Sequence, residues 1–174
     1  HIGDIRHFPR ATFHVDPEGY RHYIGLSRFS QVRAGFLRAL LPDDFESRIG
    51  ALSRDRYVPG NFGLGDFSRG IDLFRDGSVI VIPLPGHMRG HIGIQVSDTG
   101  GGKYFFVGDA AWRLESVVEN SPPFPVTRLL IDDWAAYRRT LGELHRLHLA
   151  RPDLMIVPCH CEKLADPGSP FHVA

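Results

Sequence analysis

The sequence contains no apolar run long enough to cross a bilayer, and it contains few cysteines. A membrane-spanning helix needs ~20 consecutive apolar residues, and the first residues show no charged-then-apolar signal pattern. The two cysteines, Cys159 and Cys161, are separated by one residue, which is too close for an ordinary structural disulfide. We therefore expect a cytoplasmic protein with no membrane partner.

The sequence also has no excess of either charge. Twenty Lys and Arg residues balance twenty Asp and Glu residues, and the basic residues form no stripe. Because nucleic-acid binding relies on clustered positive charge, we expect no nucleic-acid partner. With 43% apolar residues, the chain can bury one sizeable core, so residues 1–174 are predicted to form a single domain.

Histidine, by contrast, is plentiful, with ten residues in the chain. Three potential metal ligands each follow an apolar run that is predicted to form a strand. His87 comes after Val79–Ile82, Asp109 follows the strand that stops at Gly108, and His160 comes after Leu154–Val157. Side chains at strand ends can converge on one pocket, and imidazole and carboxylate groups suit zinc, or iron or manganese in its place. The pattern therefore predicts a metal site.

The strand before His87 has the clearest boundaries. Val79–Ile82 is apolar at every position, which predicts burial on both faces. Asp76-Gly77 predicts a type I′ hairpin turn before it, and Pro83 and Pro85 remove the N–H donors that would extend it. His87 is therefore expected in a loop at the C-terminal end of a buried strand.

Four other potential ligands are predicted to have structural roles. Cys159 and Cys161 flank His160, and on extended backbone their side chains point away from it, which favours packing for both. His145 and His148 lie three residues apart on a predicted helix. No carboxylate has suitable spacing there, so we expect surface or packing residues.

Ser27–Leu41 is predicted to form an amphipathic helix, because its apolar residues recur at helical spacing with arginines between them. One interpretation is a helix that covers the core and keeps a solvated basic side. The other is a lid beside a substrate site, because Pro42 and several glycines follow and imply irregular chain. The sequence leaves both interpretations open.

Four landmarks in order resemble the metallo-β-lactamase superfamily. Residues 85–91, Pro-Gly-His-Met-Arg-Gly-His, resemble its P-G-H-T-x-G-H segment, and residues 106–109 resemble its strand ending in Gly-Asp. Residues 158–160, Pro-Cys-His, resemble its terminal metal histidine. Residues 1–3, His-Ile-Gly, resemble the end of its first motif, H-x-H-x-D-H-x-G. The resemblance extends from residue 1 to about residue 163.

The resemblance implies an α/β fold of the α+β kind, namely an αββα sandwich whose N-terminal strands and H-x-H-x-D residues are missing here. It implies that His87 binds a first metal, that Asp109 bridges, and that His1 and His160 bind a second. His87 and Asp109 would be the catalytic residues, on one or two zinc ions. His91 or Arg89 would orient these ligands without binding the metal themselves.

The resemblance also implies hydrolysis. A metal-activated hydroxide would attack an ester, thioester, lactone or amide of a small-molecule substrate, as in lactonases or glyoxalase II-like enzymes. Two alternatives remain open, an iron-dependent redox member of the superfamily and a non-catalytic remnant of the fold. Missing ligands predict an impaired enzyme, and missing strands would expose a sheet edge and favour a homo-oligomer.

Within this superfamily, variable substrate-side elements tend to lie between the first motif and the loop of His87. The predicted helix at Ser27–Leu41 and the irregular chain after it occupy that part of the sequence. The resemblance therefore implies that Phe36 and Tyr57 border the substrate pocket.

Overall fold

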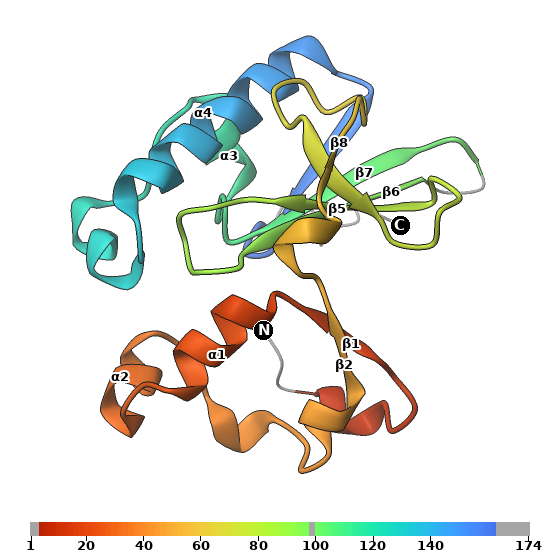
Figure 1. Ribbon diagram of the computed structural model, residues 1–174. Coiled ribbons are helices and arrows are strands. Elements are labelled where there is room, and N and C mark those ends of the chain that lie inside the picture. Colours follow the sequence, from red (N-terminus) through yellow and green to blue (C-terminus); the bar gives the residue numbers. More distant parts are fainter. Residues whose placement is uncertain (1–3, 98–99, 163–174) are drawn as a thin grey trace.

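A six-stranded sheet forms the centre of the computed structural model, which describes residues 4–97 and 100–162 (Figure 1). The strand order is β3-β4-β5-β6-β7-β8. Neighbouring strands are antiparallel from β3 to β7, and β8 runs parallel to β7. The strands are β3 (Val58–Pro59), β4 (Arg69–Asp72), β5 (Val79–Pro83), β6 (Ile92–Ser97), β7 (Lys103–Gly108) and β8 (Leu154–Pro158).

Helices α3 (Leu114–Val118) and α4 (Trp134–Ala150) lie on one side of this sheet (Figure 1). Helix α4 begins at the cap residue Asp133, whose carboxylate accepts a hydrogen bond from the Ala136 N–H at 2.9 Å. Its apolar face packs on the sheet and forms the main core. The core residues on that face are Tyr137, Leu141, Leu144 and Leu147.

Strand β5 is buried on both faces, as its uninterrupted apolar sequence predicts. Ile80 and Ile82 belong to the core beneath α4. Val81 points to the opposite face, where it packs with Leu52 and Tyr57. The strand therefore has two packed sides, and its C-terminal end is held firmly in place.

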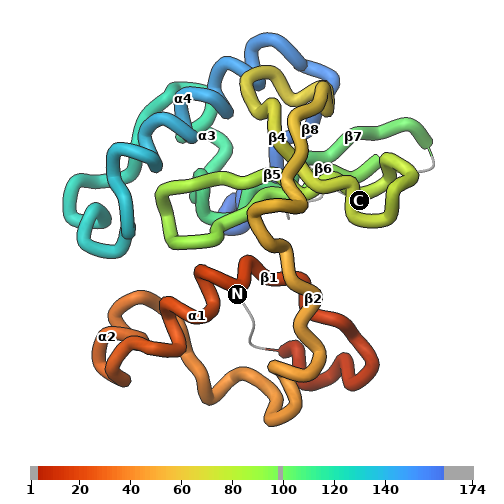
Figure 2. Tube along the Cα trace, in the orientation of Figure 1, coloured from red at the N-terminus to blue at the C-terminus, as the bar shows by residue number. Residues whose placement is uncertain are grey.

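The N-terminal part of the chain forms a smaller unit beside the sheet (Figure 2). In it, β1 (Phe13–Val15) pairs in parallel with β2 (Ile49–Ala51). The Tyr23 hydroxyl accepts a hydrogen bond from the Arg89 N–H at 2.9 Å, which joins this unit to the loop after β5. The α-helices of this N-terminal unit are α1 (Pro17–Ile24) and α2 (Arg28–Arg33). It also contains the 3-10 helices η1 (Ile5–His7), η2 (Arg38–Leu40), η3 (Phe45–Arg48) and η4 (Arg54–Arg56).

The single helix predicted for Ser27–Leu41 is wrong, because α2 ends at Arg33. Gly35 has φ +71°, and the Phe36 N–H donates to the Gln31 carbonyl at 2.8 Å. This is the hydrogen-bond pattern of a Schellman cap, which ends a helix at a residue in the left-handed region. The apolar side chains of α2 do not cover the core either, since Phe29 is 80% exposed.

The predicted type I′ turn at Asp76-Gly77 also changes. The β4–β5 hairpin exists, but positive φ falls on Arg75 and Gly77 and not on Asp76, so its loop is longer than a two-residue type I′ turn. The Asp76 carboxylate instead accepts from the Ser78 N–H at 2.9 Å. The proline-rich segment after α3 contains a 3-10 helix, η5 (Pro125–Leu130).

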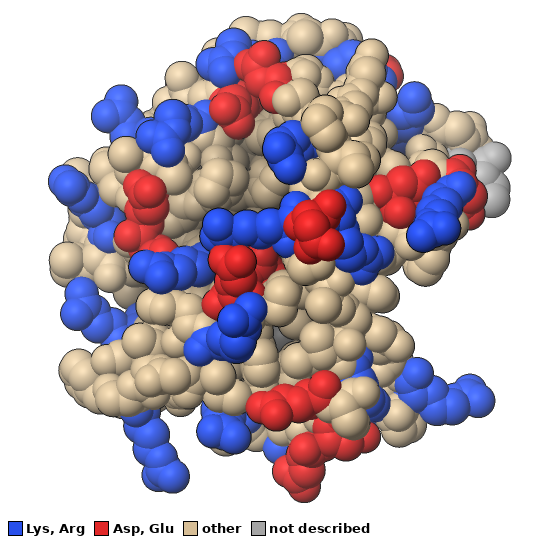
Figure 3. Space-filling model, viewed as in Figure 1, with Lys and Arg blue, Asp and Glu red and all other residues tan. Residues whose placement is uncertain are grey.

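The surface carries charges of both signs. On the face shown in Figure 3, basic and acidic side chains alternate along the boundary between the N-terminal unit and the sheet. None of the helices in residues 4–97 and 100–162 has the length and apolar character needed to cross a bilayer.

The loop after β5 approaches α4 so closely that Gly86 has no room for a side chain. A Cβ atom at Gly86 would lie 2.3 Å from the backbone nitrogen of Tyr137, and its φ is +134°. We expect Gly86→Ala to lower the free energy of unfolding by about 2 kcal/mol or more, because backbone must move. Urea denaturation measures this change.

Gly142→Ala is the matched control on the same helix. Its added Cβ would meet no atom closer than 3.7 Å. Alanine favours a helix interior over glycine by up to about 1 kcal/mol, so this variant should be as stable as the parent or more so. Equal destabilisation of the two variants would contradict the packing described here.

Candidate metal centre

Three strands that run in the same direction deliver potential metal ligands to one edge of the sheet. β5 and β7 are both antiparallel to β6, and β8 is parallel to β7, so the C-terminal ends of β5, β7 and β8 share an edge. His87 follows β5, Asp109 follows β7 and His160 follows β8. The structure therefore brings together these three predicted residues. His1 lies outside the described residues.

The carboxylate of Asp109 lies between two imidazole rings. Its Oδ2 is 3.3 Å from His87 Nε2, and its Oδ1 is 3.1 Å from His160 Nε2. Asp109 and His87 are largely buried, with side chains 13% and 18% exposed, whereas His160 is 49% exposed. Each carboxylate oxygen therefore has its own imidazole, which is the arrangement that a carboxylate bridging two cations requires.

A third donor lies on the His160 side. The thiol of Cys159 donates to Asp109 Oδ1 at 2.8 Å. One ligand atom each from Asp109, Cys159 and His160 lie within 4.8 Å of one another. Catalytic zinc sites typically use three protein ligands, so these three described donors fit one cation. On the Oδ2 side, the described residues supply His87 together with the shared Asp109.

The neighbours of Asp109 keep its carboxylate charged. Burial alone would raise its pKa, but hydrogen bonds from His87 and Cys159 and the charges of His87 and His160 hold the pKa well below its usual range. The same contact acts oppositely on Cys159, because burial and the nearby Asp109 carboxylate raise the pKa of its thiol to about 12. A bound cation would reverse this effect by favouring the thiolate.

His91 holds the backbone of Asp109. Its Nε2 accepts a hydrogen bond from the Asp109 N–H at 3.2 Å, and its ring centroid is 5.7 Å from that of His87. Burial and the adjacent His87 lower the pKa of His91 to about 4. The ring is therefore neutral near pH 7, as its role as an acceptor requires.

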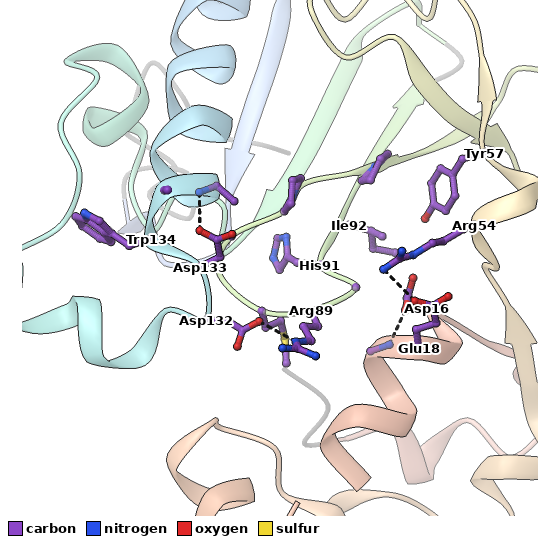
Figure 4. A pocket seen from close by; sticks show the side chains of 18 of the residues that line it. Asp16, Glu18, Arg54, Tyr57, Arg89, His91, Ile92, Asp132, Asp133 and Trp134 are labelled. Atoms are coloured by element: carbon purple, nitrogen blue, oxygen red, sulfur yellow. Dashed lines mark hydrogen bonds and ion pairs between the residues drawn. The ribbon is translucent and has the colours of Figure 1, made fainter. Parts of the chain in front are cut away.

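Arg89 acts on the loop and not on a ligand side chain. Its Nε lies 3.3 Å from the carboxylate of Asp132 (Figure 4). The Asp132 N–H in turn donates to the His87 carbonyl at 3.0 Å. Arg89 thus connects the start of α4 to the loop that carries His87.

Two adjoining cavities lie beside these residues. One, of about 830 Å³, is lined by His87, Asp109 and His160 together with Phe36. The other, of about 1010 Å³, is lined by Tyr57 and bordered by ion pairs such as Arg54 with Glu18 (Figure 4). Phe36 therefore lies in the cavity of the potential ligands. Tyr57 lies in the neighbouring one, because it packs on the sheet face beside Val81.

The predicted packing role is wrong for Cys159 and right for Cys161. Cys159 is exposed and contacts Asp109, whereas Cys161 is buried against Leu114. The prediction assumed extended backbone, but residues 159 and 160 form a turn, so their side chains need not alternate. Pro158 at the strand end was the available signal that the extended backbone stops there.

His145 is a packing residue, as predicted. Its Nδ1 lies 2.9 Å from the Val117 carbonyl, which links α4 to α3. It is not among the residues that line the cavity of the potential ligands.

Comparisons with known proteins agree with this fold. The profile of the metallo-beta-lactamase superfamily matches residues 1–160, and no curated protein is significantly similar in sequence. One similar solved structure is a variant of B. thuringiensis AiiA with N-decanoyl-L-homoserine bound at its active site. Another is an N-acyl homoserine lactone hydrolase with the product N-hexanoyl-L-homoserine bound at its catalytic metal center.

The two solved structures show the same fold over half of their length. Each is 13% identical to this chain and has a TM-score of 0.62, and the match covers 92% of this chain and 51% of the other. The chain thus spans about half the length of the structures it resembles.

The donor geometry predicts a graded effect of substitutions on zinc affinity. We expect His160→Ala and Asp109→Ala to weaken zinc binding more than His91→Gln, because the first two remove a donor atom. Loss of an outer hydrogen-bond partner such as His91 costs roughly 10–100-fold. Competition with a zinc-chelating dye measures the dissociation constants.

His145→Ala is the control, because its ring contacts only the α3–α4 interface in the contacts described above. Its zinc affinity should equal that of the parent. A loss at His145 as large as that at His160 would contradict the assignment.

Proposed function

Because the chain belongs to the metallo-beta-lactamase superfamily, we propose that it provides the metal site of a hydrolase that cleaves an ester, thioester, lactone or amide in a small molecule. One observation carries this proposal. The Asp109 carboxylate lies between His87 and His160, and these three side chains line the same cavity.

We propose zinc as the metal, since imidazole, carboxylate and thiol groups are its usual ligands. When bound, such a cation lowers the pKa of a water molecule to about 7 and polarises a carbonyl oxygen. The protein's own groups hold the donors in place. Asp109 stays ionised, His91 fixes its backbone, and the Asp132 N–H fixes the His87 carbonyl.

The cavity favours a substrate with an apolar acyl portion. Aromatic side chains line it together with the potential ligands. Phe36 is stacked on Tyr23 with ring centroids 5.9 Å apart, and the Tyr20 and Phe45 centroids are 5.5 Å apart. Its volume, about 830 Å³, is in the range of small-molecule sites. We propose that the acyl portion packs on Phe36 while the reacting carbonyl lies beside Asp109.

The known ligands of the two similar structures support this substrate class. Both are acylated homoserines, one with a decanoyl and one with a hexanoyl group. An acyl lactone is therefore the first substrate to test.

Substitution of Phe36 should change substrate preference without changing metal content. We expect Phe36→Ala to lower kcat/KM for a decanoyl lactone by roughly 10–200-fold relative to a short-chain lactone, the usual range for lost contacts in an apolar pocket. Phe29→Ala is the control, because Phe29 is 80% exposed on neighbouring α2. Unchanged preference in Phe36→Ala would contradict the acyl-site assignment.

The described donors also predict how much zinc the chain holds. We expect about one tightly bound zinc per chain and slow lactone hydrolysis, because the described residues place a three-donor group, Asp109, Cys159 and His160, on one side of the Asp109 carboxylate and His87 on the other. Metal analysis by mass spectrometry and a lactone assay measure both. Two tightly bound zinc ions with ordinary turnover, about 1–10³ per second, would contradict this expectation.

The identity of the metal separates the alternatives. Iron in the purified protein would favour a redox member of the superfamily. Failure to bind any of zinc, iron or manganese would favour a non-catalytic remnant.

A further inference from the structure

We propose that the Cys159 thiolate is a direct metal ligand, completing a sulfur, nitrogen and oxygen donor set with His160 and Asp109. The proposal rests on the metal-binding part of the proposed function. It adds a residue that the resemblance does not carry over, since the matched motifs contribute only histidines and the aspartate.

The backbone after β8 places the thiol over Asp109. Residues 159 and 160 form a turn directly after Pro158, and the Cys159 N–H donates to the Gly108 carbonyl at 3.4 Å. This contact joins the end of β8 to the end of β7. Successive side chains, Cys159 and His160, thereby reach the same carboxylate oxygen, at 2.8 Å and 3.1 Å.

The spacing of the three donors suits a tetrahedral cation. Zinc bonds of about 2.0–2.3 Å to nitrogen, oxygen and sulfur place neighbouring ligand atoms roughly 3.4 Å apart. The Cys159 and His160 donor atoms lie 2.8 Å and 3.1 Å from Asp109 Oδ1, and all three donors lie within 4.8 Å of one another. Shifts of about 1 Å would therefore fit these three described donors around an ion.

A thiolate would change which metal the site selects. Sulfur is a soft donor, which zinc accepts well and manganese or magnesium accept poorly. Two anionic donors, Asp109 and Cys159, also match the double charge of the cation. We therefore infer a site that prefers zinc or cobalt over manganese.

The sequence supplies its own matched control. Cys159 and Cys161 are its two cysteines, so any thiolate–metal signal belongs to one of them. Cys161 is buried against Leu114 and Val157, away from the exposed Cys159. Cys159→Ser and Cys161→Ser therefore make the same chemical change at a site residue and at a packing residue.

Cobalt(II) spectroscopy tests the proposal without any substrate. The metal-free parent chain and both variants are titrated with cobalt(II). We expect a near-ultraviolet thiolate-to-cobalt band in the parent and in Cys161→Ser. Cys159→Ser should lose that band, retain the visible cobalt absorbance from the remaining donors, and bind cobalt at least tenfold more weakly.

Alkylation gives an independent measure on the unaltered chain. Iodoacetamide, added at about pH 9 to 10 because burial and Asp109 raise the pKa of the thiol to about 12, should modify Cys159 in the metal-free protein. Bound zinc should slow that modification at least tenfold, as located by peptide mass spectrometry. Persistence of the sulfur band in Cys159→Ser, or equal alkylation with and without zinc, would overturn the proposal.

The outcomes separate the two proposals. Cobalt binding without a sulfur band in the parent chain would overturn the role of Cys159 and leave the proposed metal site standing. No cobalt or zinc binding by the parent chain would overturn both.

Discussion

The Asp109 carboxylate and the two imidazoles beside it are the contact on which the rest of the site depends. Burying a carboxylate costs free energy unless charge or hydrogen bonds compensate it. Here His87 and His160 lie on its two oxygens and Cys159 donates to one of them. The packed core below holds the strand ends that carry these groups, so the electrostatic arrangement and the sheet stabilise each other.

Sheet topology explains why residues far apart in sequence meet at this point. His87, Asp109 and His160 follow strands that run in one direction, and the core beneath α4 fixes the spacing of those strands. Such strand ends can be recognised in a sequence because burial requires uninterrupted apolar runs and prolines end them. The positions of these three residues, and the burial of β5, were predictable for that reason.

The remaining features depend on backbone conformation, which residue pattern alone does not determine. The apolar spacing in Ser27–Leu41 suits a long helix, but Gly35 adopts positive φ and α2 ends at Arg33. Side chains alternate along extended backbone, so Cys159 and His160 were predicted to point apart. A turn at both residues instead brings their side chains to one carboxylate. Tyr57 packs on the sheet and lines the adjoining cavity, and its place beside a substrate stays a prediction.

The contact between the His87 loop and the start of α4 has a consequence for motion. The N–H groups of Asp132 and Asp133 donate to the carbonyls of His87 and Gly86, both at 3.0 Å. Neither amide can exchange with solvent while its hydrogen bond is closed. Hydrogen exchange at these two amides would thus report how often the His87 loop separates from the start of α4.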